Sequence, residues 1–344
     1  MKKKLLGFGI IIFFIAVTIR IVLINVNPED FVRLYFESNK VYIALGLLAL
    51  VVSWCFDASA LYQLIKITGT ETSWWYAFKL TMIGQYYSLI TPSSTGGQPA
   101  QIYYMNKDNI TVGKGTAILV NKFVVFQTTV TLYSLILSLF GAGIVFRVIK
   151  PAAAFIIVGF LVNIMILLGI VLLIYNPKAV EKMVYGILKF AHKIKLVKNI
   201  DEKLLKLEEQ MNEYKINIPM LIQNKKLAIK SVLFTALQLT AFFSVTYFVH
   251  KGLNLNGSSF IEILSLQALL FIAVSFVPIP GTIGASEAAF CAIFGAIFAP
   301  GVRAFAMIAW RGITYYINII VTGFYTLGVY LWDRHEIRHL EIEK

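Results

Sequence analysis

The stretch Thr91-Pro92-Ser93-Ser94-Thr95-Gly96-Gly97-Gln98-Pro99 decides how this chain folds, because it interrupts an otherwise apolar run from Trp74 to Tyr104. A second apolar run, Phe260 to Ala299, is interrupted in the same way by Pro278-Ile279-Pro280-Gly281-Thr282-Ile283-Gly284. Proline and glycine at this density end helices. Non-helical backbone is tolerated at membrane depth only inside protein or beside a water-filled cavity. Each break therefore predicts either a loop outside a membrane or a re-entrant turn within it.

The overall composition is that of a membrane protein. Of the 344 residues, 58% are hydrophobic and 14% are charged, and the mean hydropathy is +0.75. Because an average soluble domain carries roughly 25% charged residues, most soluble classes are excluded, and so is disorder. The net charge of +13 is interpreted as an orientation signal, with no nucleic-acid partner expected. Cys55 and Cys291 lie in apolar runs and are expected to fill space; no metal and no cofactor is predicted.

Six further apolar runs are long enough to cross a bilayer, which takes roughly 20 residues. They are Leu5–Ile24, Val41–Ile65, Thr116–Phe146, Ala152–Tyr175, Ser231–His250 and Val302–Trp332. No small-residue cleavage site follows the first run, which predicts an uncleaved span rather than a signal peptide. The predicted fold is an all-α polytopic membrane protein with one transmembrane domain, about six full spans and two Pro/Gly-broken re-entrant hairpins.

The basic residues predict the orientation of the chain. If both broken runs return to the side from which they enter, and the N-terminus is inside, the inner segments hold most of the 31 Lys and Arg residues. The positive-inside rule then places both termini in the cytoplasm of a cell whose plasma membrane the chain crosses. Two plain two-span hairpins would give the same sidedness, so the charges do not decide how deep the hairpins go.

The loop of residues 176–230 is basic and contains one amphipathic segment. Its apolar residues recur at helical spacing: Ile200, Leu204, Leu207, Met211 and Tyr214. A helix lying on the inner leaflet, held by anionic headgroups, is the expected structure. A helix that docks on a partner is the alternative.

The two breaks resemble each other, which predicts an internal repeat. Pro92-x-x-x-Gly96 matches Pro280-x-x-x-Gly284 at an offset of 188 residues, and one span later Lys122 matches Arg311 at 189. A chance match between apolar regions is the alternative. The repeat units would be residues 41–146 and 231–332, each a span, a re-entrant hairpin and a span.

In the predicted topology the two repeat units have opposite orientations. Such inverted repeats place a substrate site near the midplane, between broken helices whose N-terminal ends attract anions. The helices expected to start near Gln98 and Ala285 would direct free N–H groups to this centre, where a phosphate group is a natural occupant.

Few charged residues lie at membrane depth, and each needs a partner or a polar cavity. Asp57 and Glu287 are the acids within the predicted spans and hairpins. We expect Glu287 to pair with Arg311, and Asp57 to pair with Lys122. These pairs either fix helix packing or line a polar cavity that touches a zwitterionic or anionic headgroup. Arg20 is expected to extend to the interface, and Lys79 to lie near the inner headgroups.

The tract after Lys79 is rich in hydroxyl and amide groups: Gln85, Tyr86, Tyr87, Ser88, Thr95, Gln98, Gln101, Tyr103 and Tyr104. Uncharged hydrogen-bonding groups suit recognition of sugar or phosphate, and equally the satisfaction of re-entrant backbone. The candidate substrate-binding residues are Asp57, Pro92, Thr95, Gly96, Gly97, Gln98, Gln101, Lys122, Pro280, Gly281, Gly284, Glu287 and Arg311.

These motifs resemble a known family. The stretch from Thr91 to Gln101, the stretch from Pro278 to Glu287, and Trp310-Arg311 are similar to the flippase-like family. This family is the lysylphosphatidylglycerol synthase transmembrane region, which also occurs in uncharacterised UPF0104 membrane proteins. The resemblance covers essentially the whole chain.

The resemblance implies lipid translocation. In full-length multiple-peptide-resistance proteins, this region moves aminoacylated phosphatidylglycerol to the outer leaflet, and a separate soluble domain makes that lipid. Other members are thought to handle polyprenyl-phosphate-linked sugars. Because the chain ends at Lys344, we expect no synthase domain and no lysyltransferase activity. Many members carry an acidic residue or Arg where this chain has Gln98 and Gln101, so a less charged glycolipid headgroup fits at least as well.

The leading hypothesis is therefore a flippase for a phosphate-containing lipid, with membrane lipids as partners and a homo-oligomer as an open possibility. A secondary transporter of a small polar solute, with Glu287 as the coupling group, is one alternative. A membrane-embedded lipid transferase is the other, although the sequence shows no nucleophile–base cluster for it.

Overall fold

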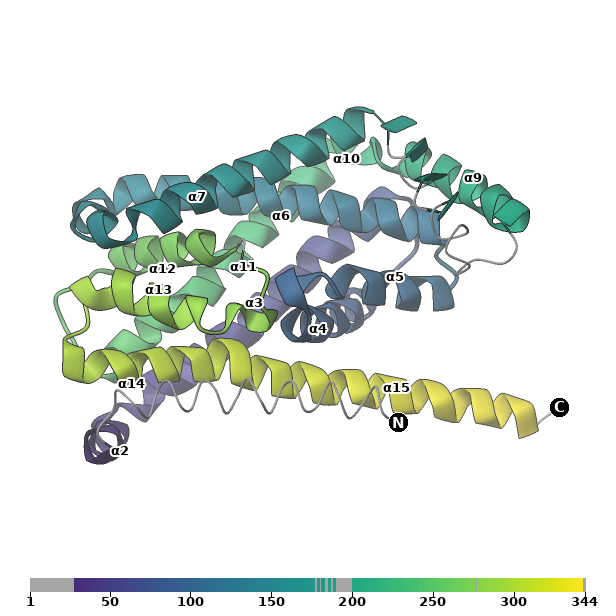
Figure 1. Cartoon of the computed structure of the whole chain (residues 1–344). Coiled ribbons are helices and arrows are strands. Elements are labelled where there is room, and N and C mark those ends of the chain that lie inside the picture. The colour runs from purple at the N-terminus through teal and green to yellow at the C-terminus, as the bar shows by residue number, and fades with distance from the viewer. Residues whose placement is uncertain are drawn as a thin grey trace.

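The computed structural model describes residues 28–342, apart from 177, 180, 183–184, 187, 190–199 and 276. The predicted span Leu5–Ile24, together with Arg20, lies outside the described residues. Within the described part, all regular secondary structure is helical (Figure 1). The predicted all-α class is thus confirmed.

Four long helical segments are apolar enough to cross a membrane. They are α3 (Lys40–Ile67), α6 (Val112–Phe140), α11 (Lys225–Gly252) and the continuous helical segment Pro300–Arg334. The last comprises α14 (Pro300–Arg311), a π-helical turn (Gly312–Ile317) and α15 (Asn318–Ile342). A helix of 28 residues is about 42 Å long, which exceeds the ~30 Å hydrocarbon core.

The predicted boundary between the third and fourth spans is wrong. The chain turns at Gly141, and α7 (Ala142–Tyr175) runs as helix through Arg147 and Lys150. The amide of Gly141 donates to the Leu137 carbonyl at 2.8 Å, and a β-carbon at Gly141 would overlap Ser265. Hydropathy continues unchanged to Phe146, so the turn is set by this contact with a remote helix. The apolar segment Ile156–Gly169 of α7 is shorter than the four long ones.

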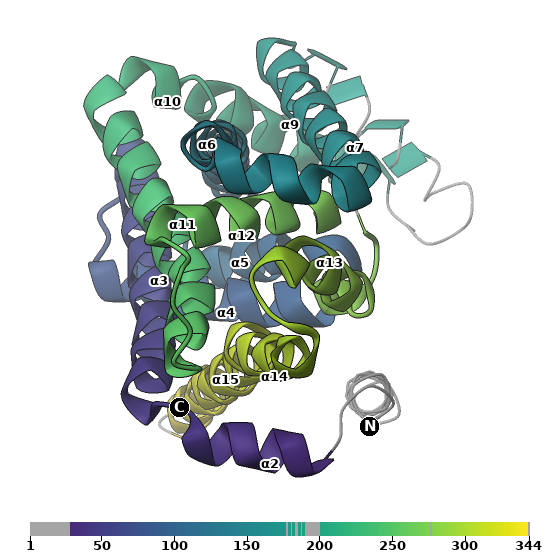
Figure 2. The same cartoon turned by 90° about the vertical axis from the view of Figure 1, so that its left-hand side faces the viewer.

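Helices α3 and α11 form an antiparallel pair along their whole length (Figure 1). The amide of Asn39, at the start of α3, donates to the carbonyl of Gly252, at the end of α11, at 2.7 Å. The short α2 (Pro28–Glu37) precedes this junction. The pair forms one wall of the molecule, and Figure 2 shows α6 and α7 on a second side and α14 on a third.

Two helical hairpins lie between these walls. The first consists of α4 (Trp74–Ile90) and α5 (Gly97–Lys107), and the second of α12 (Phe260–Val274) and α13 (Ala285–Ile293). Figure 1 shows them entering from opposite ends, and the breaks at their tips contact each other in the middle of the molecule. At 1.5 Å per residue, even the longest arm, the 17-residue α4, is only about 26 Å long.

Aromatic packing fixes the second hairpin. The ring of Phe290 on α13 stacks on Phe294 at 4.6 Å and on Trp310 of α14 at 5.0 Å. All three side chains are buried, in a core shared with α11 and α12. Stacked aromatic rings at these distances add to the burial energy, so α13 is held firmly against α14.

The helix α9 (Ile200–Asn217) docks on the start of α6, followed by the single turn α10 (Met220–Gln223). Gln210 accepts a hydrogen bond from the Gly113 amide, and Glu213 accepts one from the Thr111 hydroxyl. The predicted stripe is partly covered, because Leu207, Met211 and Tyr214 pack against Ala117 and Val120 of α6. The side chains of Ile200 and Leu204 are not among those described. The exposed part of α9 is not purely charged, because Leu205 and Ile216 on the same helix are 70% and 57% exposed.

Replacing Gly113 by Val is expected to release α9. A β-carbon at this position would overlap the Gln210 carbonyl and lie 2.9 Å from the Glu213 β-carbon. Overpacking of this kind costs about 1–3 kcal/mol, so amide hydrogen exchange in residues 207–217 should accelerate roughly tenfold to a hundredfold. Gly115→Ala is the matched control, because its β-carbon would make an ordinary 3.4 Å contact with Met105. Unchanged exchange in Gly113→Val would show that α9 docks by other contacts.

Candidate functional site

The first break is held by its own side chains. The Thr91 hydroxyl accepts from the Gly96 amide at 2.8 Å and donates to the Tyr87 carbonyl at 2.7 Å. The Thr95 hydroxyl donates to the Pro92 carbonyl at 2.9 Å. Local bonds of this type replace the helical hydrogen bonds that a break removes. Thr95 therefore serves the backbone, while Pro92 at the tip and Gln98 beyond it are exposed.

Glycines let α5 lie close against α4. A β-carbon at Gly97 would overlap the Ser88 hydroxyl and lie 2.7 Å from the Gly84 carbonyl. Across the same interface, the buried amide of Gln101 donates to the Leu80 carbonyl at 2.9 Å. Gln101 is thus a packing residue of the hairpin, and this function accounts for both Gln101 and Gly97.

The second break has nearly the same backbone as the first. Ser93 and Gly281 have φ of 51° and 58°, and the following Ser94 and Thr282 have φ of 55° and 52°. Each break also begins with a proline at the first position of a short 3-10 turn. The two conformations diverge at the next residue, where Thr95 has ψ −16° and Ile283 has ψ 137°, and they differ further at Gly96, with φ −80°, and Gly284, with φ 85°.

Glu287 and Arg311 form the predicted ion pair. The Arg311 Nε lies 2.7 Å from Glu287 Oε1, and the two side chains are 8% and 4% exposed. The second Glu287 oxygen accepts the Gly284 amide at 2.6 Å, and the Arg311 guanidinium also donates to the Gly281 carbonyl. The Cζ atom of the Arg311 guanidinium lies 4.7 Å from the centre of the Tyr315 ring. The pair therefore ties the second break, including Pro280, to α14.

Asp57 and Lys122 form the other predicted pair, at 2.8 Å. The Gln85 amide donates to the second Asp57 oxygen at 3.3 Å. These three residues come from α3, α6 and α4, and the Lys122 side chain remains 20% exposed. The pair thus joins three helices and is more open than the pair at Arg311.

The residue Tyr315 links the two hairpins and was not among the candidates. Its hydroxyl donates to the Leu89 carbonyl at 3.4 Å, from one turn after Arg311 to the end of α4. In the sequence, the only indication of this role is weak: Tyr315 follows Arg311, the predicted partner of Glu287, by four positions. By contrast, Lys79 pairs with Asp108 at 2.8 Å in an exposed position and takes no part in the junction of the tips.

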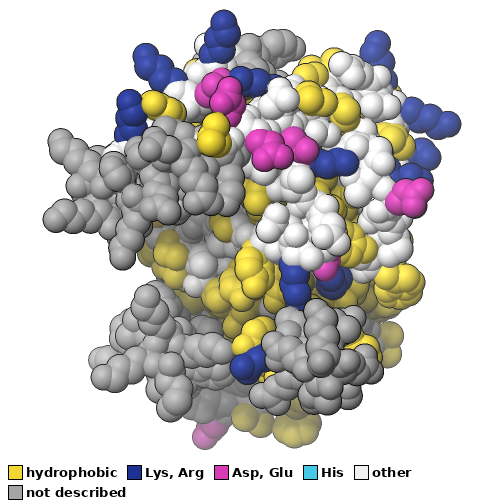
Figure 3. Space-filling model, turned by 90° about the vertical axis from the view of Figure 1, so that its right-hand side faces the viewer, with side chains coloured by type: hydrophobic (Ala, Val, Ile, Leu, Met, Phe, Trp, Pro, Cys, Tyr) yellow, Lys and Arg dark blue, Asp and Glu magenta, His cyan; other side chains and the backbone are white. Residues whose placement is uncertain are grey.

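The basic residues gather at one end of the molecule. Figure 3 shows Lys and Arg side chains spread over this face. Lys66 lies in the last turn of α3, Lys107 in the last turn of α5, and Lys225 is the first residue of α11. Lys40, Lys251 and Arg303 lie at the opposite helix ends. Lys66 and Lys107 follow predicted spans or hairpins, and Lys225 lies near the end of the predicted 176–230 loop.

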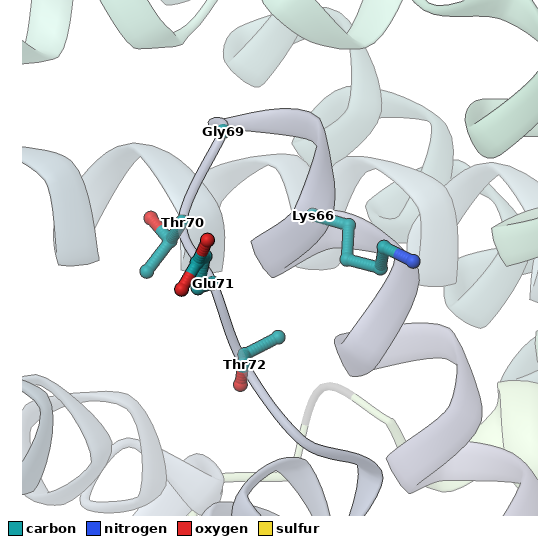
Figure 4. A pocket seen from close by; sticks show the side chains of 5 residues that line it. All are labelled: Lys66, Gly69, Thr70, Glu71 and Thr72. Atoms are coloured by element: carbon teal, nitrogen blue, oxygen red, sulfur yellow. The ribbon is translucent and has the colours of Figure 1, made fainter.

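A shallow depression of about 370 Å³ lies on the surface at the turn between α3 and α4 (Figure 4). It is lined by Lys66, Gly69, Thr70, Glu71 and Thr72, and by no residue of either break. Within the described ranges, no cluster of three or more His, Cys, Asp or Glu side chains could hold a metal ion.

These features define a multi-pass α-helical membrane protein with two opposed hairpins and two internal ion pairs. The chain belongs to the family described as Lysylphosphatidylglycerol synthase TM region, which matches residues 4–322. It is also similar to a UPF0104 membrane protein of Archaeoglobus fulgidus. That relative is 22% identical over 290 residues, which cover 82% of this chain and 85% of the relative.

Proposed function

We propose that this protein translocates a phosphate-containing lipid across the membrane, by way of the junction between the two hairpin tips. The observation that carries the proposal is the contact between the breaks at Pro92–Ser94 and Pro280–Thr282, midway between the two ends from which the hairpins enter, with the Glu287–Arg311 pair bound to the second break. Broken helices that meet inside a membrane protein supply polar backbone where a charged headgroup would otherwise face hydrocarbon.

The proposal includes an inverted repeat of residues 41–146 and 231–332. Each unit would take in most of a 28-residue helix, a hairpin with a Pro-initiated break, and a long helix with a cation near its first third. The hairpins would be re-entrant, with the basic end of the molecule in the cytoplasm. Two units of opposite orientation offer equivalent routes from each leaflet, as moving a lipid between leaflets requires.

Transport of a small solute with Glu287 as the coupling group is less well supported. Both oxygens of this carboxylate are engaged, one by Arg311 and the other by the Gly284 amide. A coupling carboxylate must release its partners to take up a proton, and here each release would also undo the break. The engaged geometry favours a fixed role for Glu287.

The family description refers to lysylphosphatidylglycerol, so an aminoacyl-phosphatidylglycerol is one candidate lipid and a polyprenyl-phosphate-linked glycolipid is another. Both have a phosphate group in or next to the headgroup. The exposed Gln98 and the half-buried Tyr86, Tyr87 and Ser88 suit hydrogen bonding to either headgroup.

Translocation is expected in vesicles that contain the purified protein. In liposomes with headgroup-labelled phospholipids, a reagent added outside should reach labels that start in the inner leaflet. This should happen roughly tenfold faster or more than in empty vesicles, since an uncatalysed headgroup must cross hydrocarbon. Vesicles with an unrelated polytopic protein are the control. If no phosphate-containing lipid crosses faster than in that control, the proposed function is wrong.

A further inference from the structure

The two internal ion pairs differ in how completely their cations are engaged. Arg311 has three kinds of partner: the Glu287 carboxylate, the Gly281 carbonyl and the Tyr315 ring. Its side chain is 8% exposed, whereas that of Lys122 is 20% exposed. Within the described part of the chain, Lys122 has Asp57 as its recorded polar partner. An ammonium group has three N–H donors. Lys122 therefore has donors available for a further acceptor, whereas Arg311 is more fully engaged.

Two buried polar groups without partners lie one helical turn from Asp57 and Gln85 along their helices. Among the described residues, the indole N–H of Trp54 and the hydroxyl of Thr81 have no hydrogen-bond partner, although the two side chains are only 5% and 1% exposed. Trp54 lies one turn before Asp57 on α3, and Thr81 lies one turn before Gln85 on α4. They therefore share the helix faces that carry the pair. Buried donors are normally satisfied by protein, water or ligand.

Gln85 connects this pair to the hairpin that carries the first break. It donates to Asp57 and precedes the end of α4 by five residues, and Tyr86, Tyr87 and Ser88 continue the polar tract along α4 toward the tip. Amide and hydroxyl groups therefore follow one another along α4 between the ion pair and the first break.

We propose that the Asp57–Lys122 pair is the exchangeable charge site for the headgroup, while the Glu287–Arg311 pair is a fixed clamp. Lys122 leaves Asp57 and binds the phosphate oxygens of the lipid. Asp57, still held by Gln85, then binds a cationic group of the same headgroup. This inference rests on the proposed function and narrows its substrate class to headgroups that carry both a phosphate and an ammonium.

The order of preference follows from the cost of leaving a buried charge unpaired. A zwitterionic headgroup satisfies both members of the opened pair. A headgroup with phosphate alone satisfies Lys122 and leaves Asp57 with one amide. An uncharged glycolipid satisfies neither. Affinity is therefore expected to fall in that order.

Binding and translocation should be measured on the same variants of the full chain. The first variant, Asp57→Asn with Lys122→Gln, is neutral. The second, Asp57→Lys with Lys122→Asp, keeps an ion pair but reverses it. Lys79→Asp with Asp108→Lys reverses the exposed pair in α4 and α5 as a matched control. Thermal unfolding in detergent establishes that each variant is folded, and short-chain phosphatidylethanolamine, phosphatidylglycerol, a neutral glycolipid and inorganic phosphate serve as probes.

The wild type and the control are expected to be stabilised most by the zwitterionic lipid, and little by inorganic phosphate. Both Asp57/Lys122 variants should lose this stabilisation, which corresponds to roughly tenfold or greater loss of affinity, and should lose translocation to the same degree. The inference is overturned if the wild type binds the neutral glycolipid as tightly as the zwitterionic lipid. It is also overturned if the variant with the reversed pair binds the zwitterionic lipid as tightly as the wild type does. If the lipid binds and the variants abolish binding but no lipid crosses the membrane, the charge site stands and the proposed translocation fails.

Discussion

Replacement of Arg311 by Met should cost about 3–5 kcal/mol of the free energy of unfolding, because it leaves the Glu287 carboxylate buried without its cation. It also removes the donor to the Gly281 carbonyl, which is one of the contacts that hold the second break. Native proteins are stable by only about 5–15 kcal/mol. We therefore expect a large fall in the unfolding midpoint, measured by tryptophan fluorescence in detergent, and loss of translocation.

The origin of this loss can be tested with a second substitution. Glu287→Gln alone keeps an acceptor for the Gly284 amide and removes the charge, so it should destabilise the protein through the unpaired Arg311. Combining Glu287→Gln with Arg311→Met removes both charges, and the double variant should be more stable than the sum of the single effects predicts. The control is Lys79→Met, whose exposed pair with Asp108 contributes less than about 1 kcal/mol. A single-variant loss as small as that of the control would contradict the clamp.

Replacement of Gly281 by Ala should also be severely destabilising. Gly281 has φ +58°, and its added β-carbon would overlap the Tyr315 ring. The left-handed backbone costs about 1–2 kcal/mol for a residue with a side chain, and overpacking adds about 1–3 kcal/mol. Since Tyr315 also donates to Leu89 of the first hairpin, displacing its ring should separate the two tips. The readouts are thermal unfolding and lipid translocation.

Two other glycines separate the two contributions. Gly284→Ala would place alanine at φ +85° and ψ −51°, outside the left-handed helical region that Gly281 occupies and more strained for a residue with a side chain, but no atom lies within 4 Å of its added β-carbon. Gly328→Ala lies in α15, also has open space, and has no recorded positive φ. Gly281→Ala is expected to destabilise the protein mainly through contact with the Tyr315 ring and Gly284→Ala through its backbone alone, while Gly328→Ala should be neutral or slightly stabilising. A Gly281→Ala variant as stable as Gly328→Ala would show that the tyrosine ring moves away without cost.

Much of the candidate site could be predicted from local chemistry. The positions of both breaks follow from proline and glycine, and the match of Pro92 to Pro280 anticipates the match in backbone conformation between Ser93 and Gly281. Both ion pairs follow from the cost of an unpaired charge in apolar surroundings, which leaves few possible partners. The comparisons confirm the family that the same motifs indicated.

Other features depend on contacts between remote segments, and sequence patterns did not reveal them. The turn at Gly141 is marked by the approach of Ser265, not by a change in hydropathy. The stripe on α9 looked like a membrane-facing surface, and part of it is instead covered by α6. In both cases an apolar pattern indicates that a surface is buried but does not indicate what covers it.

The sequence by itself determined the membrane class, the two breaks and the pairing of the internal charges, because backbone preference and the cost of burying charge act residue by residue. Only the tertiary structure decided that the breaks meet tip to tip, that Tyr315 joins them, and that one ion pair is fully engaged while the other stays partly open. These features depend on the shapes of helices far apart in the chain, since close approach and exposure arise only when those helices pack together.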